Sequence, residues 1–496
     1  MTESTLPSTP HRHRLLLLGA VGLFVFSSRL WLIQVWGSPL PFWDQWQAEG
    51  LNLYAAWERG TFQWSQLFTP HNEHRIALTR LASLGLYLVG DGWHPWNQLL
   101  LNALLHAGTA VLLVWALFRG AASALLPLGA LTIAAVFALP AGWQNALWGF
   151  QSQVYFSGLL AVAAMVGLIH HSPDRAFWWA GLVAGGLAVF GNAGGALALP
   201  AAAVGYALRL SVETGRRSTV QEQQLSSRPL LWGGLIVILV AAGLISLLRV
   251  EVPGHAYLRA KSIGQFVTVF GHSLAWPGMQ HPALALVIQA PLVLWLLHAW
   301  RNHQISRSDA IATALVAWAV LQAAAIAYSR GAGLPESRPL SRYHDPLLLG
   351  MAGQCYAMLR LAVSNLRGGR AIALLWAGVV AVGALQLTTT NLSLHLPYKR
   401  LQDDAGYAAI QAYLLSGDLS GWAYPPLPHP DPRVLKQLLD DPALRAVWPQ
   451  ELTAPSLRPW PIAYGRSCLI LATFVLLIAA ALTQRNNVSL NSQESR

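Results

Sequence analysis

The sequence predicts an all-α polytopic membrane protein, and three observations lead to this fold class. Of the 496 residues, 54% are hydrophobic and only 11% are charged, whereas a soluble domain typically has about 25% charged residues. The mean hydropathy is +0.42. Apolar runs about 20 residues long, which is the length of a membrane-spanning helix, recur along the chain.

The apolar runs predict roughly 12 spans. They begin near Leu15, Asn97, Ala121, Val154, Phe177, Gly194, Leu230, Pro282, Ala310, Pro346, Ala371 and Ser467. The first run lacks a small-residue cleavage site, so we expect it to remain as the first span. The Gly-rich segment from Phe177 to Leu208 predicts either two short spans or one broken helix, which is tolerated only inside protein or beside a water-filled cavity.

Basic residues at the ends of the spans predict the orientation, because cytoplasmic loops carry an excess of Lys and Arg. The motif HRHR precedes the first span and places the N-terminus in the cytoplasm. The basic loops GRRSTVQEQQLSSR, RNHQISR and NLRGGR fall on the same side if residues 263–279 form an interfacial or re-entrant segment instead of a span. Since the composition is rich in Arg and Ala, we expect a bacterial inner membrane, with both termini cytoplasmic.

The opposite, periplasmic face is then expected to carry the long loops. We expect residues 1–390 to form a transmembrane domain with a large first periplasmic loop, 37–95, that contains juxtamembrane helices. Residues 391–464 are expected to form a small periplasmic helical segment that packs on the other outer loops. Residues 465–496 are expected to form the last span and a cytoplasmic tail. Because function concentrates in loops held by a rigid scaffold, the outer loops are where a site is expected.

Charge and cysteine content exclude several classes of protein. The net charge of +11 is not gathered in a domain apart from the membrane, so nucleic acid is not an expected partner. The arginines orient the spans or bind anionic lipid phosphates. Cys355 and Cys468 lie in predicted spans, which argues against a disulfide framework or a reactive thiolate. No Gly-rich nucleotide loop is found, which argues against direct use of a sugar nucleotide.

The first outer loop opens with PFWDQWQAEG, which combines carboxylates with tryptophans. At helical spacing, one stripe holds aromatic residues and the rest of the surface is polar, which predicts an amphipathic helix in the headgroup plane. The aromatic stripe comprises Trp43, Trp46, Tyr54 and Trp57, and the polar face comprises Gln45, Glu49, Asn52 and Arg59. Asp44 has two interpretations: it caps this helix through the Asp44-x-x-Gln47 spacing, or it is a general base.

The second unit of this loop is FTPHNEHRIALTRL. Thr69-Pro70 predicts a helix start, with Thr as the cap and Pro at the first position. The run HNEHR offers His and Glu as general bases or metal ligands and Arg for phosphate. The alternative is a solvated, salt-bridged helix start.

The layout of residues 1–120 resembles that of the GT-C integral-membrane glycosyltransferases. These use polyprenyl-phosphate sugars as donors and include aminoarabinose transferases, protein O-mannosyltransferases and rhizobial lipopolysaccharide sugar transferases. In that family, an acidic residue lies in the first juxtamembrane helix after the first span, and a second juxtamembrane helix follows. Asp44 in FWDQW takes the place of the catalytic acid, HNEHRIALTRL that of the second motif, and GDGWHPWNQLLLNALLHAG the approach to the second span.

The resemblance implies transfer of a sugar from a lipid-linked donor to a lipid, glycan or protein acceptor. Asp44 would deprotonate the acceptor hydroxyl for an inverting displacement, and Glu73 and His74 would position Asp44 or bind the acceptor. The residues expected to hold the donor phosphate are Arg75, Arg80, His255, Lys261, Arg342 and Tyr343. The amides expected to contact sugar hydroxyls are Gln144, Asn145 and Gln151, and the rings expected to stack on the sugar are Trp143 and Trp148.

Blander roles exist for these outer residues. The cations can anchor helix ends by reaching to lipid headgroups, and the amides with Trp143 and Trp148 can belong to an aromatic belt. The loop GWQNALWGFQSQVYF has no carboxylate, so a divalent metal shared between the first two outer loops has little support, and no other cofactor is predicted.

Two other functions remain open. A non-enzymatic transporter or lipid flippase would need polar residues through the middle of the bundle. The predicted spans are mostly Leu, Ala, Val and Gly, and the main exceptions are Asn102 and His106 in the second span. A surface-polysaccharide polymerase or ligase also uses lipid-linked sugars and outer-loop arginines. The large first loop with Asp44 favours the GT-C function.

Overall fold

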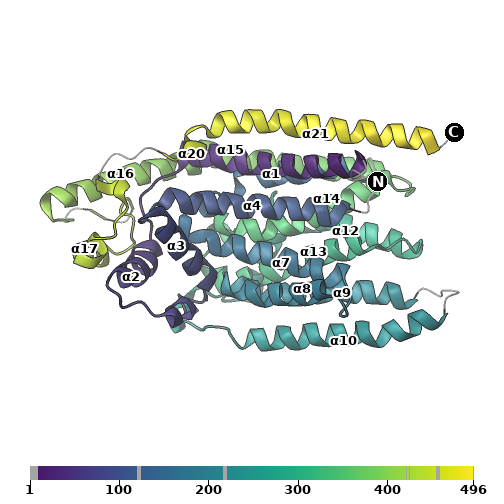
Figure 1. The fold of residues 1–496 in the computed structure, drawn as a ribbon, viewed down its shortest axis with the longest axis horizontal. Helices are drawn as coiled ribbons and strands as arrows, with labels where there is room; N and C mark the ends of the chain where they lie inside the picture. The colour runs from purple at the N-terminus through teal and green to yellow at the C-terminus, as the bar shows by residue number, and fades with distance from the viewer. Residues whose placement is uncertain are drawn as a thin grey trace, which may run out of the picture.

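The computed structural model describes residues 9–119, 125–215, 221–419, 422–423, 425–453 and 458–494. Over these ranges the regular elements are helices, most of which run side by side along one direction (Figure 1). The predicted all-α fold is therefore confirmed.

Eleven helices of the described ranges are long and apolar enough to cross a membrane. They contain α1 (Thr9–Trp36), α4 (Pro95–Phe118), α5 (Leu125–Ala138), α7 (Ser152–His170), α9 (Ala198–Gly215), α10 (Gln221–Ser246), α12 (Leu284–Arg301), α13 (Arg307–Arg330), α14 (His344–Val363), α15 (Gly369–Thr390) and α21 (Gly465–Glu494). A shorter apolar helix, α8 (Ala176–Leu187), packs against α7. The eleven candidates agree with the roughly 12 spans predicted, and the chain is a multi-pass membrane protein.

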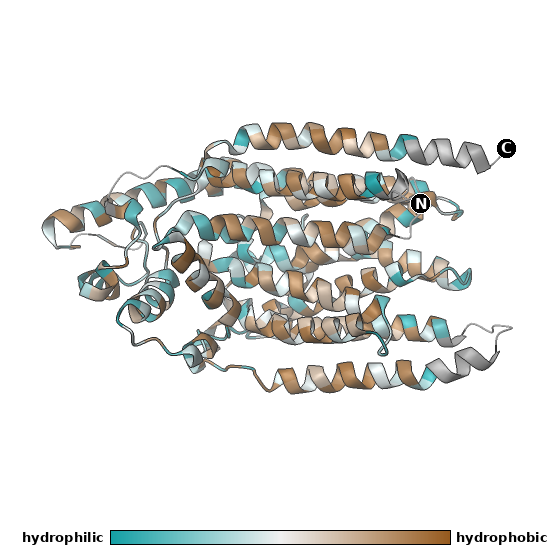
Figure 2. Ribbon diagram, viewed as in Figure 1, coloured by the Kyte–Doolittle hydropathy of each residue, from teal (hydrophilic) through white to brown (hydrophobic). Residues whose placement is uncertain are grey.

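The N-terminal end of α1 and the C-terminal end of α21 lie at the same end of the bundle (Figure 1). We call this the inner end, and the opposite end, which carries the non-spanning helices, the outer end. Along α10 and α21 Figure 2 shows mostly apolar residues. Large apolar side chains on these helices and on α15, among them Val240, Leu375 and Ile470, are exposed, as expected of surfaces that face lipid.

Two ambiguous segments are resolved by the structure. Residues 177–208 form two helices: α8 continues into η5 (Ala188–Phe190), and η6 (Ala193–Leu197) leads into α9. The segment 263–279 contains only the 12-residue helix α11 (Ile263–Leu274), which is not one of the candidate spans. A helix of this length is too short for a span, as expected of an interfacial or re-entrant segment.

Small residues let helices approach closely in the bundle. A Cβ atom placed on Gly181 of α8 would lie only 2.9 Å from the Cα of Gly167 on α7. Such contacts are typical of helix association in lipid, where no hydrophobic effect drives helices together. We therefore expect larger residues at either position to separate α7 from α8.

The outer end is built from two segments far apart in the sequence. The first holds η1 (Gln45–Ala55), α2 (Ala56–Glu58), η2 (Trp64–Phe68) and α3 (Ala77–Gly90). The second holds α16 (Leu396–Ser416), α17 (Pro432–Asp440), α18 (Pro442–Arg445), α19 (Gln450–Thr453) and α20 (Trp460–Ala463). One hydrophobic cluster joins them, with Trp46 and Tyr54 on one side and Ile410, Leu435 and Leu444 on the other. The expected packing of the later segment on the first outer loop is confirmed.

The long helix that carries the second segment is continuous. α15 passes through a short π-helix, η11 (Asn391–His395), into α16, so that 48 residues from Gly369 to Ser416 form one helix. The remaining short helices connect the spans. They are η3 (Pro140–Gly142), α6 (Trp143–Ala146), η4 (Gly149–Gln151), η7 (Pro253–Leu258), η8 (Gly331–Gly333), η9 (Pro335–Ser337) and η10 (Ser341–Tyr343).

Candidate functional site

The first helix of the outer loop, η1, is mostly enclosed by protein. η1 is a π-helix, whose i to i+5 hydrogen bonds shift the side-chain faces from the 3.6-residue pattern. Trp46 and Tyr54 are buried as expected of apolar residues, but Gln45 and Glu49 are buried too, at 2% and 0% exposure. The prediction that Gln45 and Glu49 lie on an exposed polar face is therefore wrong, whereas Asn52 and Arg59 of the same predicted face are exposed.

Glu49 is held by three side-chain donors. Its Oε1 accepts from Ser83 Oγ at 2.6 Å and from Gln98 Nε2 at 2.9 Å, and its Oε2 accepts from Gln45 Nε2 at 3.1 Å. Burial raises the pKa of Glu49, while the three hydrogen bonds oppose this effect. Because Ser83 lies on α3 and Gln98 on α4, the network fixes η1 against both helices.

Asp44 does not cap η1. Its side chain accepts no capping hydrogen bond, and its backbone is helical, with φ −59° and ψ −19°, whereas a cap normally has an extended backbone. Its Oδ2 lies 3.3 Å from His71 Nε2, and the Asp44 side chain is 34% exposed. The capping prediction is therefore wrong, and the carboxylate remains accessible at the outer end beside an imidazole.

His71 belongs to a tight turn and not to a helix start. His71 N–H donates to the His74 carbonyl at 2.8 Å, His74 N–H donates to the His71 carbonyl at 3.0 Å, and Asn72 has φ +50°. Asn tolerates this left-handed conformation better than most residues. The helix α3 begins only at Ala77, so the predicted start at Thr69-Pro70 is wrong. The HNEHR segment is therefore not helical, and its side chains contact different parts of the chain.

Glu73, at the tip of this turn, joins three segments of the outer end. Its Oε1 lies 2.6 Å from His255 Nδ1 in η7 and 2.8 Å from an Arg330 NH2 at the end of α13. Burial raises the pKa of Glu73, but the hydrogen bonds from His255 and Arg330 and the charge of Arg330 outweigh it and lower the pKa to about 2. Glu73 is thus an anion at any physiological pH and is suited to positioning, not to accepting a proton.

His74 is neutral in this surrounding. Its Nδ1 accepts from the Ala193 N–H at 3.2 Å, which leaves the proton of the neutral ring on Nε2. Burial lowers the pKa of His74 to about 4, and the charges of Arg330 and His71 act in the same direction, against Glu73 and Asp44. The predicted residues Asp44, Glu73 and His74 therefore lie in one electrostatically coupled cluster.

Aromatic rings flank Asp44 and His71. The rings of Phe42 and Trp148 meet edge to face with centroids 5.4 Å apart, and Trp148 stacks with Phe150 at 5.8 Å. His71 meets Phe150 edge to face at 5.3 Å. Such faces suit stacking by a sugar ring or packing by an apolar chain. Trp148, which was expected either to stack on a sugar or to belong to an aromatic belt, is part of this wall.

The second outer loop and the loop before α14 are tied to each other. Gln144 Oε1 accepts from the Arg342 N–H at 3.1 Å, and Asn145 Nδ2 donates to the Arg342 carbonyl at 3.0 Å and to Asp345 Oδ2 at 2.7 Å. The Arg342 guanidinium lies over the Tyr343 ring, 5.4 Å from its centroid. The two amides expected at a sugar thus hold one loop to another, while the Arg342 guanidinium meets no carboxylate among the described residues.

The other predicted contacts are dispersed. One NH1 of Arg80 donates to the carbonyls of Gln66, Leu67 and Thr69 and to the Thr69 hydroxyl, and Arg75 donates to the carbonyls of Phe68 and Leu248. Both arginines are thereby engaged in holding the chain before α3. Gln151 is buried, and Lys261 is exposed at the start of α11.

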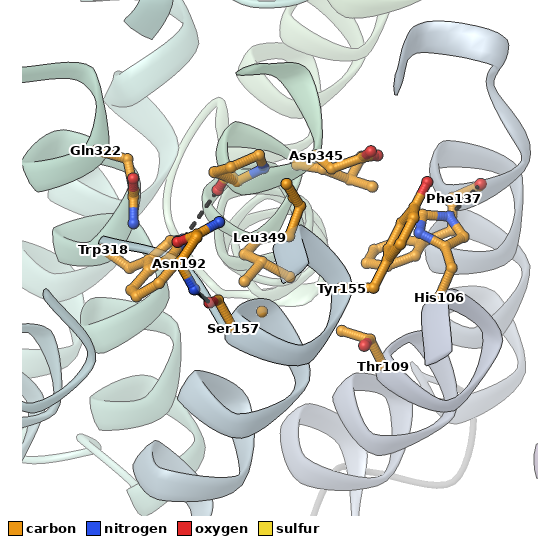
Figure 3. A pocket seen from close by; sticks show the side chains of 14 residues that line it. His106, Thr109, Phe137, Tyr155, Ser157, Asn192, Trp318, Gln322, Asp345 and Leu349 are labelled. Carbon is orange, nitrogen blue, oxygen red and sulfur yellow. Dashed lines mark hydrogen bonds between the residues drawn. The ribbon is translucent and has the colours of Figure 1, made fainter. Parts of the chain in front are cut away.

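An arginine inside the first span was missed at the sequence level. Arg29 is 2% exposed, and its NH2 lies 2.8 Å from His106 Nε2 and donates to the Phe137 carbonyl at 2.7 Å. The single charge in the apolar run FVFSSRLWLI was the signal that could have found it. Nearby, a cavity of about 30 Å³ lies between His106 and Tyr155 on one side and Asn192 and Gln322 on the other (Figure 3).

This cavity is small. Its volume is enough for about two water molecules, and its lining includes none of the predicted site residues. Among the described residues, no group of three or more His, Cys, Asp or Glu side chains is placed to hold a metal ion. Cys355 and Cys468 are both free.

The chain was compared with models of protein families, with curated proteins and with solved structures, and no match to any of them was found.

Proposed function

We propose that the protein is a glycosyltransferase that moves a sugar from a polyprenyl-phosphate donor to a cell-envelope acceptor. The observation that carries the proposal is the environment of Asp44. Its carboxylate is accessible, free of its own helix, 3.3 Å from His71 Nε2 and bordered by an aromatic wall. A general base has to be within reach of a substrate proton and positioned by a neighbour, and these features meet both conditions.

The proposed reaction is a single inverting displacement. Asp44 takes the proton of an acceptor hydroxyl while the acceptor oxygen forms a bond to the anomeric carbon. The bond from that carbon to the phosphate oxygen breaks, and the polyprenyl phosphate leaves with the electron pair. His71 would orient the carboxylate, and the partly exposed rings of Phe42 and Trp148 would stack on the sugar.

The negative charge of the leaving phosphate needs cations near the membrane interface. Arg330 is neutralised by Glu73 at 2.8 Å, so in this proposal the phosphate is received by Arg342 and Lys261. Neither of these forms an ion pair among the described residues. The site would face the periplasm, with the inner end of the bundle in the cytoplasm, as the basic loops at the inner end favour.

The test is an Asp44→Asn variant assayed in membranes supplied with polyprenyl-phosphate sugars, with release of polyprenyl phosphate as the readout. The rate is expected to fall about 10²- to 10⁴-fold, the usual contribution of a general base. Asp404→Asn is the matched control, because Asp404 is also at the outer end but 59% exposed and paired with Arg400. A folded Asp44→Asn protein with full activity would show the assignment to be wrong.

A transporter is a second candidate, favoured by the buried Arg29 and His106. A transport path needs polar residues across the membrane. Arg29 lies seven residues before the end of α1 at Trp36, which is about 10 Å from that end. Farther toward the inner end, the buried core residues of α1 and α4 include the apolar side chains of Leu17, Val21 and Leu113. The buried pair of Arg29 and His106 thus lies in the outer part of the bundle and does not continue toward the inner end, which favours the glycosyltransferase over a transporter.

A further inference from the structure

A cavity larger than the one beside His106 lies at the inner end of the bundle, whereas Asp44 lies at the outer end. Its volume is about 310 Å³, at the lower end of the range of small-ligand sites. It lies where α4 and α7 end, α13 begins and α14 ends. Its lining includes five basic side chains: Arg119, His170, His171, Arg307 and Arg360.

The arginines of this inner-end cavity are only partly neutralised. Arg307 is paired with Glu213 at 3.2 Å. Arg360 donates to the Tyr356 hydroxyl at 2.9 Å and lies over the Trp295 ring. Among the described residues, the Arg119 guanidinium meets no carboxylate and donates no hydrogen bond; it lies over the Trp115 ring at 4.6 Å. No carboxylate belongs to the described lining of the cavity.

His171 reports the electrostatic field at this place. Its pKa is lowered, first by partial burial and then by the positive charges of Arg119, Arg307, Arg209 and Arg175. Four arginines acting in one direction on one imidazole indicate a positive contribution to the potential at this place. Glu213, which pairs with Arg209 and Arg307, offsets part of it, whereas Arg119 has no such partner among the described residues. An anion would therefore be attracted to the cavity.

We propose that the inner-end cavity binds a phosphate-bearing anion, supplied by the headgroup of an anionic phospholipid of the adjoining leaflet. The guanidinium group matches phosphate geometry and forms charge-assisted hydrogen bonds with it. Basic pockets between the ends of spans are the places where anionic headgroups bind. The cavity is also next to the ends of four candidate spans, and lipid headgroups meet a membrane protein at the ends of its spans.

The test is native mass spectrometry of the full chain in detergent with phosphatidylglycerol, with phosphatidylcholine, or with inorganic phosphate alone. The wild type is expected to retain phosphatidylglycerol over phosphatidylcholine. Arg119→Gln should weaken that retention about fivefold, since one cation near a membrane surface contributes about 1 kcal/mol. Arg370→Gln is the matched control, because Arg370 is also at the inner end and exposed but does not line the cavity.

Two arms separate the sources of phosphate. If millimolar inorganic phosphate displaces phosphatidylglycerol from the wild type but not from Arg119→Gln, the cavity takes phosphate in either form. If phosphate does not displace it, the lipid is the specific ligand. Equal retention of phosphatidylglycerol by the wild type and Arg119→Gln, or equal loss in Arg119→Gln and Arg370→Gln, would overturn the proposal. Thermal unfolding of each variant confirms that it is folded.

Discussion

Replacing Glu73 with Gln removes the anion that joins the turn of residues 71–74, η7 and α13. The pKa of Glu73 is lowered from 4.5 to about 2. At 1.36 kcal/mol for each pKa unit, a difference of about 2.5 units corresponds to about 3 kcal/mol of stabilisation of the ionised form. The Glu73 and Arg330 side chains are 21% and 20% exposed, so solvent screening reduces this value only moderately. Glu73→Gln should therefore destabilise the outer end by about 2–3 kcal/mol at pH 7.

The stabilisation by ionised Glu73 should depend on pH in a defined direction. Because the folded pKa lies below the unfolded value of 4.5, the stabilisation is fully present above pH 4.5. It is lost as the pH falls from 4.5 toward about 2, where the folded protein also takes up the proton. The stability difference between the wild type and Glu73→Gln should shrink over the same interval.

The assay is unfolding of the full chain in mixed micelles, together with limited proteolysis of the outer loops. Glu336→Gln is the matched control, because Glu336 is 75% exposed and its pair with Arg338 should contribute less than about 1 kcal/mol. A Glu73→Gln protein that is no less stable than Glu336→Gln, or that shows the same acid sensitivity as the wild type, would refute the reasoning.

Three further predictions concern neighbouring features. Burial lowers the pKa of His74 to about 4, so the unfolded chain binds the proton more readily than the folded one. The free energy of unfolding should therefore fall as the pH drops from about 6.5 to about 4. The His74→Gln variant should lose this pH dependence in the same unfolding assay. In Gly50→Ala, the new methyl would lie 2.6 Å from Leu444 Cδ1, which should cost about 1–3 kcal/mol and make α18 more accessible to protease. His106→Leu should destabilise by about 1–3 kcal/mol because the buried Arg29 guanidinium loses a partner, and a second change, Arg29→Met, should recover most of that loss in a melting experiment.

The spans could be predicted because their signal is local. About 20 apolar residues in a row must be helical in lipid, whatever their neighbours are. The prediction that residues 263–279 form an interfacial or re-entrant segment rested instead on the distribution of the basic loops along the whole chain. The outer loop was harder, since apolar spacing alone does not distinguish a helix that meets lipid headgroups from one enclosed by protein.

The site depended on contacts between distant segments. Asp44 lies beside His71, and Glu73 lies between His255 and Arg330, and no local pattern records these pairings. The π-helical phase of η1 turned Glu49 inward, which a 3.6-residue period could not foresee. Of the two interpretations of Asp44, the structure excludes capping, and the role of general base stays a proposal.

The continuous helix from Gly369 to Ser416 sets the depth at which the outer end meets the membrane. Its 48 residues extend about 70 Å at 1.5 Å per residue, more than twice the thickness of a bilayer core of about 30 Å. Helices adapt to thicker or thinner bilayers by tilting, and a tilt of this helix would lower or raise α16 and the segments packed on it. The tilt of this helix would therefore set the height of the outer helices above the membrane surface. We expect bilayer thickness to change the distance between a lipid headgroup and Asp44.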